Sequence, residues 1–323
     1  MARRKKGHVI NGWINLHKPA GVTSTQAVSI VKRALRPKKI GHGGTLDPLA
    51  EGVLPLALGE ATKTIPYCQD SDKCYRFTVT WGQSRTTDDE EGEVLETSDV
   101  RPAEEQINSI IAKFIGEIEQ VPPRYSAIKI DGKRAYDLAR QGEEIEIKSR
   151  IINVHDLKLI KASEDSADFV CDCGKGTYIR SLGRDIAEEL GTKGYISHLE
   201  RTKVGAMQLE SAFSLAKFEE ISDSAPSDKE LGDAQRALLD EVLLSPATML
   251  DDIPALAIND REAVKLKNGQ SLLFVAKPDL QRLEKAGIQI KQTHTALTTC
   301  NDKPVALVNV DGPEIKPLRV LNL

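Results

Sequence analysis

One carboxylate in the first part of the chain, Asp47, stands in an unusual setting. It lies in GHGGTLDPLAEGVLPLALGEATK (41–63), between a glycine pair and Pro48, with no other acid until Glu51. The apolar run LPLAL that follows predicts partial burial. A buried carboxylate needs a cation or several hydrogen-bond donors, because otherwise a raised pKa neutralises it. A reactive Asp47 therefore requires a partner, and Arg180, at a predicted strand–helix junction, is the candidate.

Three interpretations of this stretch stay open from the residues alone. The first is a plain turn, since Gly43 and Gly44 supply unusual backbone angles and Asp-Pro is common in turns. The second is a phosphate cradle made of glycine amides, although the spacing is neither GxxxxGK[ST] nor GxGxxG. The third is a reactive carboxylate held by Arg180.

The segments that must position these residues show clear periodicities. Residues 22–37 predict a helix with a capping box of Thr23 and Gln26 and a stop at Pro37. YRFTVTW (75–81) alternates apolar and polar residues, which is typical of a strand. Further predicted elements are an acidic turn over 84–94, a helix over 102–116, a strand ending at Cys173, a GKGT turn, and a helix closed by Gly191.

Later segments predict the domain organisation. Residues 122–150 hold seven Lys or Arg, five acids and two interleaved tyrosines, which predicts an exposed basic excursion. Residues 219–250 are acidic and polar, and we predict a linker there. After it come a short predicted helix over 256–270 and two or three short strands around an Asp-Gly turn. We therefore expect a large first domain over 1–245, which carries Asp47, and a small β-rich domain over 246–323.

Composition and charge narrow the class of protein. The 323 residues are 40% apolar and 28% charged, as in an ordinary globular protein of about two domains. The five scattered cysteines form no CxxC pair, so we expect neither a disulfide framework nor a metal site. The basic N-terminus lacks an apolar h-region, and no run reaches the ~18 apolar residues of a membrane helix. We expect a cytoplasmic protein that does not enter membranes.

The distribution of charge matters more than the net charge of −4, which argues weakly against a nucleic-acid partner. Residues 1–40 contain ten Lys or Arg and no acid, whereas residues 219–252 contain ten acids and two basic residues. A basic segment is most often only a solvated face. This polarised chain is nevertheless compatible with phosphate binding.

Six stretches, in order along residues ~10 to ~205, together resemble the bacterial tRNA pseudouridine-55 synthase family. They are INLHKPAGVTS (14–24), the Asp47 stretch (41–63), DSDKCYRFTVTWGQSRTTDDEEG (70–92), PPRYSAIKIDGKRAYDLARQG (122–142), KGTYIRSLGRDI (175–186) and HLERTKVG (198–205). Such an ordered set is far more specific than any single short pattern.

The resemblance implies an α+β fold: a mixed, largely antiparallel sheet flanked by helices, followed by a PUA-type RNA-binding domain. It implies an isomerase that converts the uridine at position 55, in the T-loop of tRNA, to pseudouridine by base flipping and an aspartate nucleophile. The partner would be the T-arm of tRNA, with no obligatory protein partner. The reaction gains no atoms, so no metal, nucleotide or redox cofactor is expected.

The resemblance also implies roles for individual residues. Asp47 would be the nucleophile, Tyr75 would pack on the target uracil, and Arg180 would pair with Asp47. Substrate-binding residues would be His42, Tyr178, Leu199 and Lys18. The basic insertion adds four weaker candidates for RNA binding, namely Lys129, Lys133, Arg134 and Arg140.

The chemistry explains why these residue types are needed. Pseudouridine forms when the N1–C1′ bond of uridine breaks, the base turns and C5 bonds to C1′. The carboxylate of Asp47 either adds covalently to an electrophilic carbon or acts on the sugar, and the sequence leaves both routes open. Either route needs an ionised carboxylate in a dry site, which a bidentate Arg180 would stabilise.

Two other functions stay open at this point. One is an RNA-binding or RNA-folding protein with a vestigial pocket, which would have no use for an ionised Asp47. The other is a carboxylate-dependent hydrolase. A hydrolase would place a second carboxylate or a set of metal ligands beside Asp47, and the sequence indicates neither.

Overall fold

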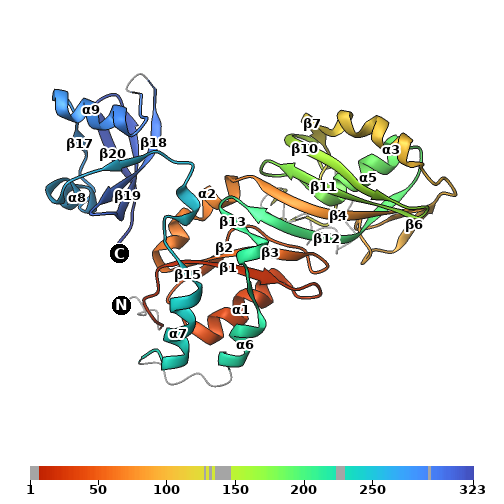
Figure 1. Ribbon diagram of the computed structural model, residues 1–323, viewed down its shortest axis with the longest axis horizontal. Coiled ribbons are helices and arrows are strands. Elements are labelled where there is room, and N and C mark those ends of the chain that lie inside the picture. Colours follow the sequence, from red (N-terminus) through yellow and green to blue (C-terminus); the bar gives the residue numbers. More distant parts are fainter. Residues whose placement is uncertain (1–6, 127–128, 131–132, 135–146, 223–229, 290–291) are drawn as a thin grey trace.

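An 11-stranded mixed sheet forms the body of the protein (Figure 1). The computed structural model describes residues 7–126, 129–130, 133–134, 147–222, 230–289 and 292–323. The strand order is β14-β1-β3-β12-β4-β11-β10-β7, with β2, β13 and β15 beside this path. The strands are β1 (Gly12–Lys18), β2 (Ile40–His42), β3 (Glu51–Leu58), β4 (Lys73–Trp81), β7 (Gly116–Gln120), β10 (Arg150–Ala162), β11 (Ser166–Cys173), β12 (Gly194–Val204), β13 (Met207–Gln208), β14 (Phe213–Ser214) and β15 (Leu243–Leu244). Most pairs are antiparallel, so the predicted α+β class is confirmed.

Helices flank the two ends of this sheet. α1 (Ser24–Leu35) begins at the predicted capping box of Thr23 and Gln26, and it packs with α6 (Ala216–Ser222) near β1. α5 (Ile179–Glu189) packs on β12 and β4, and α3 (Glu104–Ile110) packs on β10. In the sheet below α5, the rings of Phe77 and Phe169 stack with centroids 5.3 Å apart. Each helix therefore buries its apolar face on one part of the sheet.

β3 and β12 meet near the middle of the sheet in a short contact that we call the seam (residues 51–52 and 200–201). The two strands pair in parallel at only two positions, Glu200 with Glu51 and Arg201 with Gly52. Gly52 has φ +101°, and a Cβ there would lie 2.3 Å from the carbonyl oxygen of Arg201. Only glycine permits this close approach. The seam divides the sheet into a half built on β1 and β3 and a half built on β12, β4, β11 and β10.

The segment predicted to be a linker, 219–250, does not act as one. α7 (Asp233–Val242) buries Leu238, Leu239 and Val242 in the same core as the large sheet, and β15 pairs with β1. The linker prediction is therefore wrong for the part of this segment that the structure describes. The acids of α6 and α7 lie on the solvent side of these helices, and the other side of each helix packs on the body.

A second sheet follows, with its own core and the strand order β16-β18-β19-β20-β17. Its strands are β16 (Ala255–Ala257), β17 (Leu272–Leu273), β18 (His294–Cys300), β19 (Lys303–Asp311) and β20 (Glu314–Val320), and its helices are α8 (Asp260–Lys267) and α9 (Lys277–Lys285). The predicted helix and terminal strands are confirmed. The unit contacts η1 (Gly59–Thr64) of the body, because Lys63 Nζ donates to the Val320 carbonyl at 2.6 Å and the Asn322 amide donates to Glu60 at 2.8 Å.

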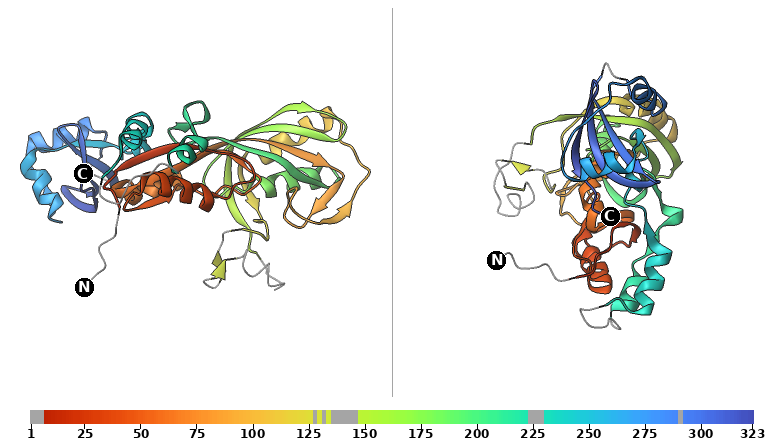
Figure 2. Two further views of the ribbon diagram at one scale, coloured as in Figure 1. Left: turned by 90° about the horizontal axis from the view of Figure 1, so that it is seen from below. Right: turned by 90° about the vertical axis from the view of Figure 1, so that its left-hand side faces the viewer.

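Two small hairpins lie outside both sheets. β5 (Gln83–Arg85) pairs with β6 (Val94–Thr97), and the predicted acidic turn connects them. β8 (Lys129–Ile130) pairs with β9 (Lys133–Arg134), and both strands stand away from the large sheet (Figure 2). Among the described residues, no helix combines the length and the apolar content needed to span a membrane.

Candidate active site

The loop that carries Asp47 connects β2 to β3 and is held from several sides. The Ser24 hydroxyl, at the start of α1, donates to the Leu46 carbonyl and accepts from the Leu46 amide, each at 2.9 Å. The Gly21 amide donates to the Pro48 carbonyl at 2.8 Å. These bonds fix both neighbours of Asp47, so the carboxylate is held in place before substrate arrives.

Lys18 braces the same loop from within the protein. Its ammonium is buried and donates to the carbonyls of Pro19 (2.9 Å), Val22 (2.6 Å) and Pro48 (3.3 Å). Burial lowers the pKa of Lys18 to about 8, while the negative charge of Asp47 opposes this change. Lys18 thus acts on Asp47 through the backbone and through charge.

The glycine pair before Asp47 allows the loop to pack closely on α2 (Ile65–Asp70). A Cβ at Gly43 would lie 2.2 Å from the Cys68 sulfur. On the other side, the buried Arg201 of β12 donates to the Val53 carbonyl at 2.8 Å and to the Gly44 carbonyl at 3.1 Å. The loop is thereby joined across the seam.

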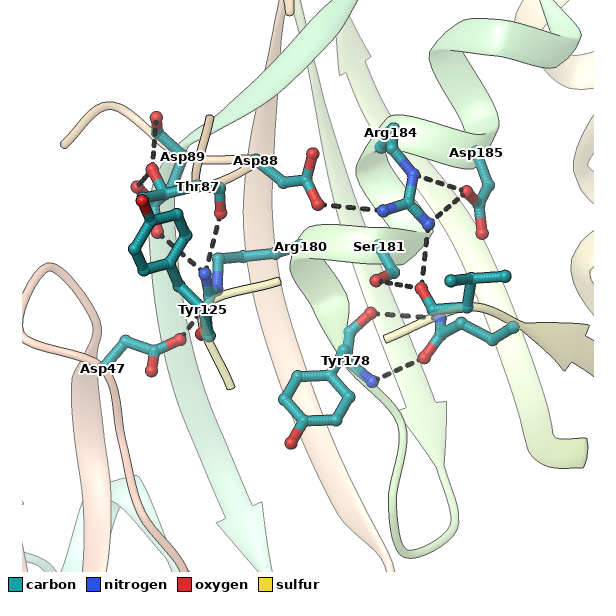
Figure 3. Close-up of polar contacts among 12 residues, drawn as sticks. Asp47, Thr87, Asp88, Asp89, Tyr125, Tyr178, Arg180, Ser181, Arg184 and Asp185 are labelled. Atoms are coloured by element: carbon teal, nitrogen blue, oxygen red, sulfur yellow. Dashed lines mark hydrogen bonds and ion pairs between the residues drawn. The ribbon is translucent and has the colours of Figure 1, made fainter. Parts of the chain in front are cut away.

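Asp47 and Arg180 form an ion pair, as the sequence predicted (Figure 3). Arg180 Nε lies 2.9 Å from Asp47 Oδ2; the Arg180 side chain is 4% exposed and that of Asp47 is 35% exposed. The contact uses one nitrogen and lacks hydrogen-bond alignment, so the expected bidentate pair is not formed. The other guanidinium nitrogens donate to the carbonyls of Thr87 (2.7 Å) and Tyr125 (2.9 Å). The buried cation is thus anchored by backbone oxygens and offers its remaining edge to Asp47.

A second carboxylate, Asp89, shares this guanidinium. It is 2% exposed, and its Oδ2 lies 3.4 Å from Arg180 Nη1. It also accepts hydrogen bonds from the Thr87 hydroxyl and from the Glu91 amide (3.1 Å). Burial raises the pKa of Asp89, and the negative charge of Asp47 adds to the rise. The inference that no second carboxylate lies near Asp47 is therefore wrong.

Beside Asp47 lies a cavity of about 380 Å³ at the seam. It is lined by Gly43, Gly44, Thr45, Leu46, Asp47, Gln69, Lys73, Tyr75, Ser126, Arg150, Gly174, Gly176, Thr177, Tyr178, Ile179, Arg180, Leu199 and Arg201. Four side chains predicted to handle the substrate, Tyr75, Tyr178, Leu199 and Asp47, thus face one space. Burial raises the pKa of Tyr75 to about 12, while the positive charge of Arg201 opposes the rise. The phenol is therefore neutral and can exchange a proton only as a weak acid.

Other predicted site residues lie elsewhere. His42 and Lys18 are not among the described residues that line the cavity. His42 ends β2, just before the Asp47 loop, and Lys18 ends β1 and braces that loop. Burial lowers the pKa of His42, and the positive charge of Arg201 lowers it further, which favours the neutral imidazole. Lys129, Lys133 and Arg134 lie in the β8–β9 hairpin, and Arg140 lies outside the described residues. The roles assigned to these residues stay predictions.

The sequence interpretation missed several charged residues of the site, among them Arg201 and Asp89. Arg201 lies two residues after the buried Leu199 on β12, so both side chains point to the same face of the sheet, and the inward position of Arg201 could have been predicted from the strand period. Asp89 lies in an acidic run that reads as a solvated turn, and no local pattern marks its burial. In the described segments, no group of three or more His, Cys, Asp or Glu is arranged to hold a metal ion.

Comparison with known proteins assigns the family. The family model described as "TruB family pseudouridylate synthase (N terminal domain)" matches residues 32–179. Two curated proteins called tRNA pseudouridine synthase B, from Caulobacter sp. (strain K31) and from Rhodospirillum rubrum, are 47% and 45% identical to this chain, and each alignment covers both chains in full. The chain belongs to the TruB family.

Solved structures share the fold of this TruB family member. A crystal structure of a Cbf5-Nop10-Gar1 complex aligns with a TM-score of 0.70 at 24% identity, covering 96% of this chain and 84% of that one. A structure of an H/ACA RNP bound to a substrate RNA containing 2′-deoxyuridine also gives 0.70, at 20% identity, covering 100% and 92% of the two chains. At these identities the likeness concerns the fold alone.

Proposed function

We propose that the protein is the tRNA pseudouridine synthase that isomerises uridine 55 in the T-loop of tRNA. The observation that carries the proposal is the Asp47–Arg180 ion pair, which faces a cavity lined by Tyr75 in a chain of the TruB family. A cavity of about 380 Å³ is large enough for one nucleoside. This supports a reaction on a single flipped base.

We assign the chemical roles as follows. The ionised carboxylate of Asp47 attacks the flipped nucleotide, either at an electrophilic carbon of the base or at the sugar. Arg180 keeps this carboxylate ionised when the bound nucleotide displaces water from the cavity. Tyr75 stacks on the uracil while the glycosidic bond breaks and the base turns. Its neutral phenol lies in the cavity where the C5 proton must leave after the new bond forms. Tyr178 and Leu199 complete the walls.

The RNA itself is held by shape and phosphate contacts, because A-form grooves hide base sequence. The insertion over 122–150 and the C-terminal unit over 246–323, a PUA-type domain in this proposal, supply such contacts. They extend the recognised surface beyond the one flipped nucleotide. We expect the reaction to take place in the cytoplasm, where tRNA is available, and to need neither a cofactor nor a protein partner.

The direct test compares the wild-type protein with Asp47→Asn on an unmodified tRNA transcript. Tritium release from [5-³H]uridine and mapping of the modified position report product, and filter binding reports RNA affinity. We expect product at position 55 with the wild type and a loss of roughly 10⁴-fold or more with the variant, at unchanged RNA affinity. Product from Asp47→Asn, or none from the wild type, would overturn the proposal. The second outcome would favour an RNA-binding protein without catalysis.

A further inference from the structure

The backbone of Tyr178 is gripped by a buried side chain from another strand. Gln120, the last residue of β7, is 1% exposed. Its Nε2 donates to the Tyr178 carbonyl at 3.1 Å, and its Oε1 accepts from the Tyr178 amide at 2.9 Å. One amide side chain thus satisfies both polar groups of one residue, in the manner of a neighbouring β-strand. The Gln120 amide therefore fixes where the Tyr178 side chain leaves the backbone.

The ring of Tyr178 is covered by a second side chain from the adjoining strand. Arg150, the first residue of β10, pairs directly with Gln120 in the β7–β10 ladder. Its guanidinium carbon lies 4.9 Å from the centroid of the Tyr178 ring, and its Nη2 donates to the Gly176 carbonyl. Arg150 also lines the cavity. A planar cation on an aromatic face restricts the ring to one orientation.

This position matters because Tyr178 is the N-cap residue of α5, the helix that carries Arg180. Its side chain makes no capping bond, so Gln120 takes over part of that task. The same helix holds the chain that follows Gln120, since Ser181 and Arg184 donate to the Val121 carbonyl at 2.8 and 2.9 Å. A shift of the Gln120 contact would therefore move the Tyr178 wall and the start of the Arg180 helix together.

We propose that Gln120 and Arg150, the paired strand residues at the base of the 122–150 insertion, are positioning residues that hold Tyr178 against the substrate. Gln120 sets its backbone and Arg150 sets its ring. Because Arg150 and Gln120 terminate the strands from which the insertion departs, the part of the chain predicted to grip RNA is anchored directly on the pocket wall. The inference rests on the proposed function for its effect on rate, and on the contacts alone for its effect on Tyr178.

The first experiment separates rate from binding under single-turnover conditions with saturating enzyme. Gln120→Met and Arg150→Met should each lower the rate constant on the order of tenfold, because a misplaced wall weakens substrate orientation. Arg150→Lys should behave like Arg150→Met, since it keeps the charge and loses the planar stack. The matched control is Lys161→Met, which removes one exposed cation near the other end of β10, outside the insertion, and it should leave the rate constant unchanged.

The second experiment measures hydrogen–deuterium exchange at the Tyr178 amide in the full chain without RNA. Gln120→Met removes the acceptor of that amide and should speed its exchange at least about tenfold, whereas Gln120→Glu retains an acceptor oxygen and should leave it protected. The Leu182 amide, which bonds to the Tyr178 carbonyl within α5, should stay protected in both variants and so reports that the helix is folded.

The outcomes are separable. Unchanged exchange in Gln120→Met, or wild-type rate constants in Gln120→Met and Arg150→Met, would overturn the positioning role. A wild-type protein without product would instead overturn the proposed function, and the exchange data would still decide whether Gln120 holds Tyr178.

Discussion

Asp47 and Asp89 contact the same guanidinium from different sides: Arg180 Nε lies 2.9 Å from Asp47 and Nη1 lies 3.4 Å from Asp89. Their exposure divides their roles. Asp89 is buried and also bonded to Thr87, whereas Asp47 opens to the cavity. Asp89 therefore orients and balances Arg180, and Asp47 is the carboxylate that faces the cavity, in agreement with the role proposed for it.

Removing the Arg180 guanidinium should show how far the stability of the fold depends on its ion pair with the buried Asp89. We expect Arg180→Met to lower the free energy of unfolding by about 3–5 kcal/mol, because a buried carboxylate loses its ion-pair partner. Adding Asp89→Asn removes that buried charge and should recover part of the loss. Urea unfolding of wild type, both single variants and the double variant gives the coupling energy. A double variant no more stable than Arg180→Met would contradict this account.

The brace formed by Lys18 should be detectable in both stability and rate. Lys18→Met leaves the carbonyls of Pro19, Val22 and Pro48 without their buried donor, so we expect a loss of about 1–3 kcal/mol in the free energy of unfolding. The single-turnover rate should fall because the Asp47 loop loosens. Lys32→Met, an exposed cation on α1, is the matched control and should change neither quantity. Equal behaviour of the two variants would exclude the brace.

Close packing behind the Asp47 loop gives a prediction that involves no charge. Gly43→Ala places a Cβ 2.2 Å from the Cys68 sulfur, so the loop or α2 must move, at about 1–3 kcal/mol. Cys68→Ala removes that sulfur, and the nearest remaining Cys68 atom lies 3.3 Å away. The double variant should therefore be more stable and more active than Gly43→Ala alone. Thermal unfolding and tritium release measure the two effects, and an additive double variant would count against the packing argument.

A pH dependence of stability follows from Asp88, which accepts a hydrogen bond from Arg184 at 2.9 Å. Burial raises the pKa of Asp88 from 3.8 to about 6, although Arg184 opposes the rise. The folded state therefore binds this proton more tightly than the unfolded state, and the stability contributed below pH 3.8 is lost as the pH rises to about 6.

Asp88→Asn removes this titration, and Asn also tolerates the left-handed φ of +61°. When the pH rises from 4 to 7, the wild type should lose on the order of 1–3 kcal/mol of unfolding free energy relative to Asp88→Asn. Urea titrations at both pH values measure it. A difference that does not change with pH would show that Asp88 has the same affinity for protons in both states.

Local patterns predicted the elements that depend on local physics. The capping box at Thr23 and the period of two in β4 each specify an element by themselves, and both are confirmed. The pairing of Asp47 with Arg180 was predictable because a partly buried carboxylate requires a cation. The second carboxylate was not, since the burial of Asp89 depends on how a distant turn folds onto α5.

The error over 219–250 has a related cause. α7 has four buried positions, three of them Leu or Val, on one side and exposed acids on the other. The average composition of the segment does not reveal this division. A helix with one apolar face reads as polar when its residues are counted rather than placed on a helical period. The single apolar stripe, and not the charge content, decides that α7 belongs to the core.

The seam lies between the two walls of the cavity. Asp47 belongs to the half of the sheet built on β1 and β3, and Arg180 belongs to the helix packed on β12 and β4. The angle between Asp47 and Arg180 therefore depends on a strand pairing of only two residue pairs. Substitutions deep in either half of the sheet, remote from any nucleotide, are expected to change turnover by slightly rotating one half against the other.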